Sequence, residues 1–220
     1  MPRHPPGSQE APRIVCISDT HELHRELDVP NGDILIHAGD FTLFSKSAAA
    51  ILDFNEWLGE LPHGFKLVTP GNHEFFLESA PLKRKLISNA IVLINEEVEI
   101  MGLKIWGSPT TPLYGGAFGL SSAADRTSLY AKVPKDVDIL ATHGPPHGIL
   151  DRRTADADNA GCPQLLAAVT RLKPKPHVFG HVHGAHGTEI YGETLFVNAA
   201  LMGLDGDLSE SAIVLRMPHD

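Results

Sequence analysis

Short apolar runs rich in β-branched residues alternate with polar segments along the first part of the chain. The runs over residues 13–18, 33–38 and 65–69 each end at Gly, Pro or an acidic residue, which is typical of buried strands. Between the second and third runs, apolar residues recur at helical spacing over residues 45–61. The order strand, loop, strand, helix, strand predicts parallel βαβ units.

The rest of the chain repeats this plan with shorter strands. A buried run over residues 138–142 precedes a helix over 162–172 and a strand over 176–179. Residues 108–122 form a long segment rich in Gly, Pro and Thr, and loops of that length tend to be functional. Smaller elements are a helix over 81–88, strands over 91–94, 97–100 and 103–106 that we expect to be antiparallel additions to the sheet, and closing strands over 187–190, 193–197 and 211–215.

Length and composition restrict the number of domains, the cellular location and the kinds of partner that we expect. At 220 residues, with 42% hydrophobic residues, we expect one domain over residues 13–217 behind a disordered tail over residues 1–12. A formal net charge of −9 argues against partners such as duplex nucleic acid or an acidic membrane surface. No apolar run approaches the length of a membrane span, so the cytoplasm is the default location. Cys16 and Cys162 lack CxxC spacing and are expected to be buried, reduced thiols.

Metal-ligand residues follow the predicted strands at the point where each strand ends. The segment Gly71-Asn72-His73-Glu74 comes directly after the run over residues 65–69 and its Pro70. Because the carboxyl ends of parallel strands deliver side chains into one crevice, we expect the residues that follow different strands to meet there. The other six candidates at strand ends are Asp19, His21, Asp40, His143, His181 and His183.

The residue types at these positions indicate a transition-metal site. In extended chain, residues two apart project to one side, so Asp19 with His21, and His181 with His183, each offer two donors in one direction. Carboxylates, imidazoles and one amide without thiolate favour Mn²⁺, Fe, Zn²⁺, Ni²⁺ or Co²⁺ over a structural zinc site. Counted with Asn72, seven donors exceed the needs of one ion, which predicts two ions bridged by Asp40. Each pair taken alone occurs by chance in many proteins, and only their combination is specific.

The motif series DxH, GD, GNHE, HG and GHxH, in this order over residues 13–197, resembles that of the calcineurin-like metallophosphoesterases. Within that superfamily the segments around Thr142–Pro146 and His177–Gly180 resemble the metallophosphoesterase-domain-containing group. The resemblance, like the strand and helix order, implies a four-layer αββα sandwich of two mixed sheets. It also implies two ligand sets that share one carboxylate, namely Asp19, His21, Asp40 and His183 for one ion, and Asp40, Asn72, His143 and His181 for the other.

The resemblance further implies a hydrolytic reaction in which a hydroxide bridging the two metals attacks a phosphoester. His73 would stay free of metal and protonate the leaving oxygen as a general acid, acting with Asn72 and Asp40 in catalysis. Glu74 and His37 are expected to support the site rather than to ligate metal. In the 108–122 loop, Tyr114 or Phe118 is either a stacking surface for a nucleobase or part of the core.

Several functions remain open within this family resemblance. Phosphodiesters, with cyclic nucleotides among them, are the preferred substrates, because the residues after Asp40 lack the Asp-Arg pair that holds a dianionic monoester in protein phosphatases. The alternatives are a phosphomonoesterase and a non-catalytic metal-binding interaction module. The expected partner is a small phosphoester, with nucleotides as candidates, and a homo-oligomer is left open.

Overall fold

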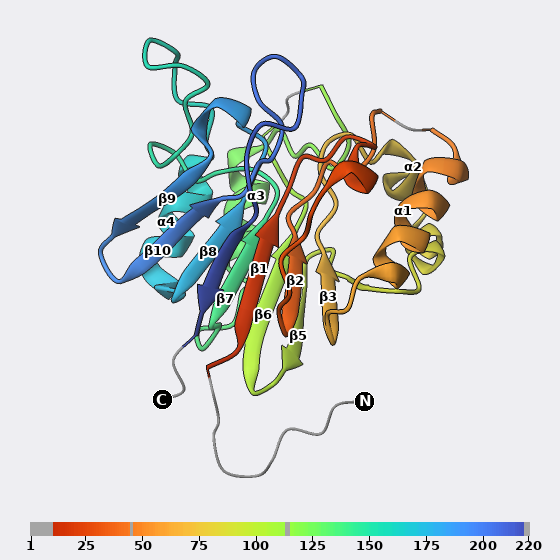
Figure 1. Cartoon of the computed structure of the whole chain (residues 1–220). Helices are drawn as coiled ribbons and strands as arrows, with labels where there is room; N and C mark the ends of the chain where they lie inside the picture. Colours follow the sequence, from red (N-terminus) through yellow and green to blue (C-terminus); the bar gives the residue numbers. More distant parts are fainter. Residues whose placement is uncertain (1–10, 45, 113–114, 218–220) are drawn as a thin grey trace.

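Two mixed β-sheets form the centre of the molecule (Figure 1). The computed structural model describes residues 11–44, 46–112 and 115–217. One sheet has the strand order β11-β1-β2-β3-β4, and the other has the order β5-β6-β7-β8-β10-β9. The strands are β1 (Arg13–Ile17), β2 (Ile34–His37), β3 (Phe65–Val68), β4 (Ile91–Val92), β5 (Glu96–Ile100), β6 (Leu103–Ser108), β7 (Ile139–Thr142), β8 (Pro176–Phe179), β9 (Gly187–Tyr191), β10 (Thr194–Asn198) and β11 (Ile213–Arg216).

Parallel pairing dominates the middle of both sheets. In the first sheet β1, β2, β3 and β4 run parallel, and β11 closes one edge as an antiparallel strand. In the second sheet β6, β7, β8 and β10 run parallel, with β5 and β9 antiparallel at the two edges. The carboxyl ends of the central strands therefore lie at one edge of each sheet, where ligands bind in open α/β sheets.

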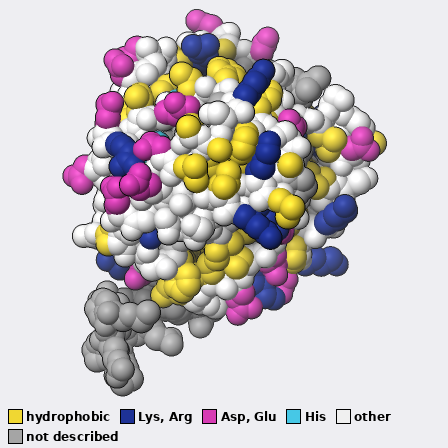
Figure 2. Space-filling model, turned by 90° about the vertical axis from the view of Figure 1, so that its right-hand side faces the viewer, with side chains coloured by type: hydrophobic (Ala, Val, Ile, Leu, Met, Phe, Trp, Pro, Cys, Tyr) yellow, Lys and Arg dark blue, Asp and Glu magenta, His cyan; other side chains and the backbone are white. Residues whose placement is uncertain are grey.

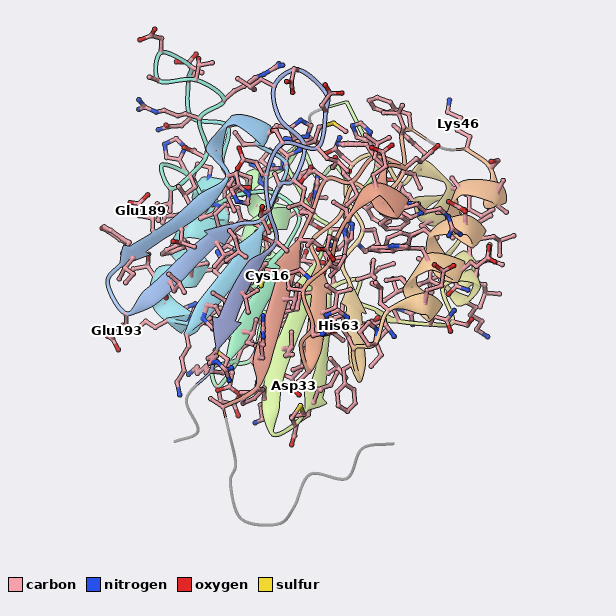
Figure 3. All side chains as sticks on the ribbon, in the orientation of Figure 1. Cys16, Asp33, Lys46, His63, Glu189 and Glu193 are labelled. Atoms are coloured by element: carbon pink, nitrogen blue, oxygen red, sulfur yellow. The ribbon has the colours of Figure 1, made fainter. Side chains whose placement is uncertain are left out.

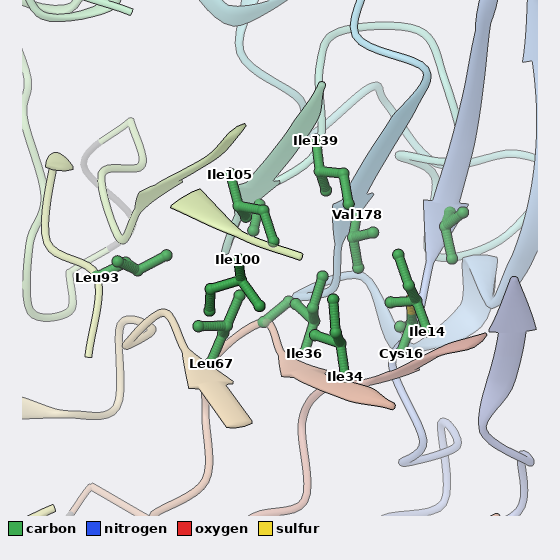
Figure 4. Packing of buried hydrophobic residues seen from close by; sticks show 14 of the residues in the cluster. Ile14, Cys16, Ile34, Ile36, Leu67, Leu93, Ile100, Ile105, Ile139 and Val178 are labelled. Atoms are coloured by element: carbon green, nitrogen blue, oxygen red, sulfur yellow. The ribbon is translucent and has the colours of Figure 1, made fainter. Parts of the chain in front are cut away.

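The largest apolar layer lies between the two sheets (Figure 4). Ile34 and Ile36 from β2 and Leu67 from β3 face Ile105 and Ile139 of the second sheet, and all are buried. A strand that is buried on both faces has a continuous apolar sequence. These strands could therefore be recognised from the sequence. Cys16 belongs to this layer, and it and Cys162 are both free, buried thiols as expected.

Helices cover the two outer faces of the sheets. The helical segments are η1 (His24–Glu26), α1 (Ala48–Glu60), α2 (Phe75–Glu78), η2 (Pro81–Leu86), α3 (Ala123–Tyr130), α4 (Pro163–Leu172) and η3 (His183–Ala185). Phe54 and Leu58 of α1 pack on the first sheet with Val15 and Leu35. Tyr130 of α3 and Leu165 of α4 pack on the second sheet with Leu140. The expected four-layer αββα sandwich is thereby confirmed.

The face that carries α1 and α2 has no continuous basic band (Figure 2). Its lysine and arginine side chains are separated by hydrophobic and acidic ones. Among the described residues, every helix is shorter or more polar than a segment that crosses a bilayer.

The elements differ from the expectations in two respects. The strands expected over 91–94, 97–100 and 103–106 do not join one sheet as antiparallel additions. β4 pairs in parallel with β3 at the edge of the first sheet, whereas β5 and β6 begin the second sheet. Helices α2 and α3 were not expected, although Ser122 accepts a hydrogen bond from the backbone N–H of Asp125, which is a helix-start signal.

Pro12, the last residue of the tail that we expect to be disordered, lies directly before β1 and is ordered. Pro12 accepts a hydrogen bond through its carbonyl from the N–H of Met217, so it belongs to the folded part. Residues 1–10 lie outside the described residues, and the domain bounds of 13–217 stay a prediction.

Candidate metal centre

The predicted ligands all lie in segments that directly follow parallel strands of the two sheets. Asp19 follows β1, Asp40 follows β2 and Asn72 follows β3 in the first sheet. His143 follows β7 and His181 follows β8 in the second sheet. Two hydrogen bonds connect loops of the first sheet to loops of the second. The N–H of His181 donates to Oδ2 of Asp19 at 2.9 Å, and the imidazole Nδ1–H of His143 donates to the carbonyl of Ala38 at 2.9 Å. Residues far apart in the chain therefore meet at one place.

One group of donors consists of Asp19, His21 and His183, whose ligand atoms lie within 4.8 Å of one another. Nε2 of His183 is 3.5 Å from Oδ1 of Asp19, and Nε2 of His21 is 4.0 Å from the same oxygen. That oxygen is buried and has no hydrogen-bond partner among the described residues. A buried carboxylate oxygen without a donor is unusual in a folded protein, and a cation is the ordinary way to satisfy it.

A second group consists of Asp40, His143 and His181, with Asn72 beside it. Nε2 of His143 lies 3.2 Å from Oδ2 of Asp40 and 2.8 Å from Oδ1 of Asn72. Because the Nδ1–H of His143 donates to a backbone carbonyl, Nε2 is the nitrogen that faces these two oxygens, and it offers a lone pair to a metal ion once it has lost its proton. Three acceptors converge on one point, and such a set fits a bound metal ion.

A third group links the first two, because His21 and Asp40 also lie within 4.8 Å of His73. Nε2 of His73 is 3.7 Å from Oδ2 of Asp40, while the backbone N–H of His73 donates to Oδ1 of Asp40 at 2.8 Å. Asp40 is thus the carboxylate at which the two predicted ligand sets approach each other.

The ionisation of these groups shows that the centre attracts positive charge. Burial opposes ionisation of Asp19, yet the adjacent imidazole of His183 and the charge on His143 hold the pKa of Asp19 well below its usual range. Burial likewise opposes ionisation of Asp40, and His143 lowers the pKa of Asp40. Burial works against protonation of His143, but the charge of Asp40 and the hydrogen bond to it raise the pKa of His143 to about 9. Two buried carboxylates therefore require a compensating cation.

Backbone strain occurs in the same loops, and no sequence pattern indicates it. Four of the predicted ligands have left-handed backbone conformations, with φ of 56° at Asp19, 42° at His21, 54° at Asp40 and 71° at His181. Non-glycine residues in this region cost free energy and cluster at functional sites. The preceding Gly39 also has a positive φ, and a Cβ there would collide with the ring of His143, so a side chain at this position is excluded.

A model of the calcineurin-like phosphoesterase family matches residues 12–185, which include all the residues of this centre. The chain belongs to that family. It is therefore a metal-dependent phosphoesterase, a hydrolase.

Curated relatives and solved structures resemble this phosphoesterase over most of its length. Metallophosphoesterase domain-containing protein 1 of Homo sapiens is 37% identical, over 97% of this chain and 72% of the human protein. A UPF0046 protein of Caenorhabditis elegans is 40% identical, over 86% of this chain and 75% of the nematode protein. One solved structure with 19% identity superposes with a TM-score of 0.65, covering 93% of this chain and 99% of that chain. The last comparison supports the fold alone.

Glu74 holds the loops after β2 and β3 of this phosphoesterase together. Its Oε2 accepts from the N–H groups of Asp40 at 3.0 Å and Gly71 at 2.5 Å, and its Oε1 accepts from the N–H and hydroxyl of Thr42 at 2.9 and 3.0 Å. Burial and the nearby charge of Asp40 raise the pKa of Glu74 to about 7. Its four partners are all donors, however, and they fit the carboxylate form, which we take as the native one at neutral pH.

His37 lies behind the centre rather than in it. It is fully buried on β2, where Nδ1 accepts from the N–H of Gly39 and Nε2 pairs with the hydroxyl of Thr20. Burial lowers the pKa of His37 to about 3, so it is neutral. The expectation of a core histidine that supports the site is consistent with this position.

The 108–122 loop reaches the centre through its backbone. The N–H of Ala117 donates to the carbonyl of Asn72 at 2.8 Å, and Gly116 lies against the side chain of Asn72 so closely that a Cβ would not fit. Phe118 is half-buried against the core cluster of α1, and its N–H donates to Glu78, which favours packing over nucleobase stacking. Tyr114 lies outside the described residues.

Two buried polar residues near the centre escaped the sequence analysis. Asn198 at the end of β10 donates from Nδ2 to the carbonyls of Leu150 and Val182, which ties the loop of His181 and His183 to its neighbour. Asp151 is also buried, and its Oδ2 accepts from the N–H groups of Gly148 and Gly161. The sequence feature that these two residues share is a polar residue within or beside an apolar run. This feature is too common to identify a functional residue.

Proposed function

We propose that this chain binds two transition-metal ions and hydrolyses phosphodiesters. The observation that carries the proposal is the adjacency of two donor groups, Asp19 with His21 and His183, and Asp40 with His143 and His181. Asp40 is proposed as the shared ligand, and Asn72 as a further ligand beside His143. Imidazole and carboxylate donors suit Mn²⁺, Fe, Zn²⁺, Ni²⁺ and Co²⁺.

The ions, when bound, would supply Lewis-acid activation of water and neutralise charge on the phosphoryl group. The protein itself would supply the proton for the leaving oxygen from His73, which lies beside Asp40 but has no hydrogen-bond partner at its buried Nδ1 among the described residues. Burial lowers the pKa of His73, while the charge of Asp40 opposes this effect. With Nε2 3.7 Å from Oδ2 of Asp40, His73 is close enough to the centre to act as the general acid.

Charge at the centre supports a monoanionic diester. Two divalent ions carry more positive charge than Asp19 and Asp40 cancel, so an anion is attracted despite the acidic chain. A dianionic monoester would need a further cation, and two candidate arginines are engaged elsewhere. Arg126 is buried and donates to the carbonyls of Leu120 and Ser121, and Arg152 donates to Asn159. Lys46 is exposed on the outside of the molecule (Figure 3), and its Nζ lies 5.9 Å from the centre of the Phe75 ring.

A surface hollow beside His183 offers room for the second ester substituent. It has a volume of about 410 Å³ and is lined by His183, His186, Leu204 and Ser209, among others. His21 lies between His183 and His73, with ring centroids 5.2 Å and 4.5 Å away. A diester whose leaving group faces His73 would thus have its other substituent near this hollow.

Substrate comparison with the purified, Mn²⁺-reconstituted full chain tests the proposal. We expect a higher kcat/KM for bis(p-nitrophenyl) phosphate than for p-nitrophenyl phosphate at neutral pH, and cyclic nucleotides belong in the same panel. A monoester preference of tenfold or more, about 1.4 kcal/mol in transition-state binding, overturns the diester assignment. The absence of hydrolysis of every ester in the panel overturns the catalytic assignment itself.

A further inference from the structure

The aromatic ring of Phe44 stacks on the imidazole of His73. The two ring centroids are 3.6 Å apart and the planes are inclined by 23°. The ring of His21 packs nearby on His73 at 4.5 Å with a tilt of 60°. Phe44 nevertheless remains 53% exposed, which is unusual for a large apolar side chain in contact with a buried site.

The position of Phe44 is fixed by bonds on the residues before it. Thr42 donates from its N–H and hydroxyl to Glu74, and its hydroxyl also approaches the carbonyl of His73 at 3.3 Å. The N–H of Leu43 donates to the carboxylate of Glu22 at 3.0 Å. Phe44 itself has a left-handed φ of 53°, a conformation that non-glycine residues rarely adopt. The loop thus holds the ring over His73 in a strained conformation.

Core packing does not account for Phe44. Phe41, three positions earlier, already supplies the core from this loop, since it is fully buried and stacks on Phe54 with centroids 4.1 Å apart. Phe44 is not part of the buried core, and its ring packs on His73 instead. Strain and exposure at one residue are typical of a functional position.

We propose that Phe44 is a specificity-determining residue that binds a planar aromatic group on the leaving side of the ester. The proposal rests on the function proposed above. A general acid must lie within hydrogen-bond reach of the oxygen that departs, so the leaving group has to pass next to His73. Phe44 is the exposed ring that continues the stack from His73, and aromatic rings attract other planar π-systems in offset or tilted stacks. Aryl groups and nucleobases are the chemical class that such a surface selects.

Two methyl phosphodiesters with leaving groups of matched acidity provide the test. One carries phenol and the other a fluorinated aliphatic alcohol, so that they differ in planarity and not in the need for protonation. In the reconstituted full chain, Phe44→Ala is expected to lower kcat/KM for the phenyl diester about 5- to 150-fold relative to the fluoroalkyl diester. Phe44→Trp should keep the preference for the phenyl diester, and Phe44→Leu, which restores bulk without a flat face, should not.

Matched controls separate this effect from general damage. Leu43→Ala removes a 57% exposed side chain from the same loop, and Phe65→Ala removes a 41% exposed ring from the start of β3, so both should keep the wild-type preference. An equal loss on both diesters in Phe44→Ala, or a Phe44→Leu variant that behaves as wild type, would overturn the proposal. If the wild-type protein hydrolyses neither diester, it is the underlying phosphodiesterase function that fails.

Discussion

Nε2 of His21 lies 3.3 Å from Nε2 of His183. The other nitrogen of His21 faces the carbonyl of Thr42, which only accepts, so Nε2 of His21 is directed toward His183 and toward the unpartnered oxygen of Asp19. These ligand atoms repel one another unless a proton or a metal ion lies between them. The folded state should therefore be more stable with metal than without it.

Metal removal is expected to lower the thermal stability of the protein. Chelation should lower the melting temperature in calorimetry and abolish phosphoester hydrolysis, and added Mn²⁺ should restore both. A metal at a hundred times its dissociation constant stabilises a protein by about 2.7 kcal/mol, which gives a shift of several degrees. His21→Ala should reduce the shift. Identical melting temperatures before and after chelation would contradict a metal site in this cluster.

Glu74→Gln is expected to weaken metal binding without touching a proposed ligand. All four partners of the Glu74 carboxylate are donors, so an amide places its NH₂ group against N–H groups and leaves buried donors unsatisfied, at a cost of about 1–3 kcal/mol each. Loss of such a supporting contact typically reduces metal affinity by about 10- to 100-fold. Metal titration of the apoprotein measures this effect.

Glu78→Gln is the matched control for that variant. Glu78 accepts a single hydrogen bond, from the N–H of Phe118 at 2.7 Å, and a glutamine carbonyl can replace it. Equal metal affinity in the two variants would show that Glu74 does not organise the centre.

His73→Ala is expected to reduce turnover and leave metal content unchanged. Loss of a general acid costs about 10²- to 10⁴-fold in rate, and the loss should shrink with a p-nitrophenyl leaving group, which needs little protonation. Rates with activated and unactivated diesters, measured beside elemental analysis, provide the check. Because His73 also groups with His21 and Asp40, a fall in metal content would instead make it a ligand.

Acid is expected to destabilise the fold through His177, away from the centre. The hydroxyl of Thr142 donates to the carbonyl of Gly144, so Nε2–H of His177 must donate to that hydroxyl, which leaves Nδ1 buried without a partner among the described residues. Burial lowers the pKa of His177 from 6.5 to about 3. The unfolded chain therefore binds the extra proton, and the free energy of unfolding falls as pH drops from about 6.5 toward 3.

Denaturant unfolding of wild type and His177→Gln measures this contribution. The wild-type free energy of unfolding should fall more steeply with decreasing pH, by up to about 1.4 kcal/mol per pH unit from this group, and the two curves should run parallel above about pH 7.5. Parallel curves through the acid range would show that His177 is not buried as a neutral ring.

That these candidate ligands would lie close together could be predicted, because their signals are local. Asp40 and His143 each follow a buried apolar run, and the rule that parallel strands end at one edge places such residues together without knowledge of the full topology. Distribution of strands between the sheets had no such signal. The pattern of β4, β5 and β6 is the same whichever sheet each one joins, so only long-range packing decides it.

The contacts around Phe44 illustrate what remained hidden in the sequence. Phe41 and Phe44 look alike in the segment after Gly39, yet one is fully buried and the other stacks on His73. The difference arises from a left-handed backbone and from bonds that Thr42 and Leu43 make to residues distant in the chain. Loop conformations of this kind are set by tertiary contacts and not by residue type.

Metal stoichiometry of Asp40→Ala is the most direct test of the proposed two-metal centre. Elemental analysis of the Mn²⁺-reconstituted wild type should give about two ions per chain, and Asp40→Ala should lose both together, since Asp40 is the proposed shared ligand. Asp53→Ala, which removes a carboxylate bound to Arg25 on the surface, should keep both ions. An active wild type with one ion or fewer, or an Asp40→Ala variant that retains two, would contradict the account.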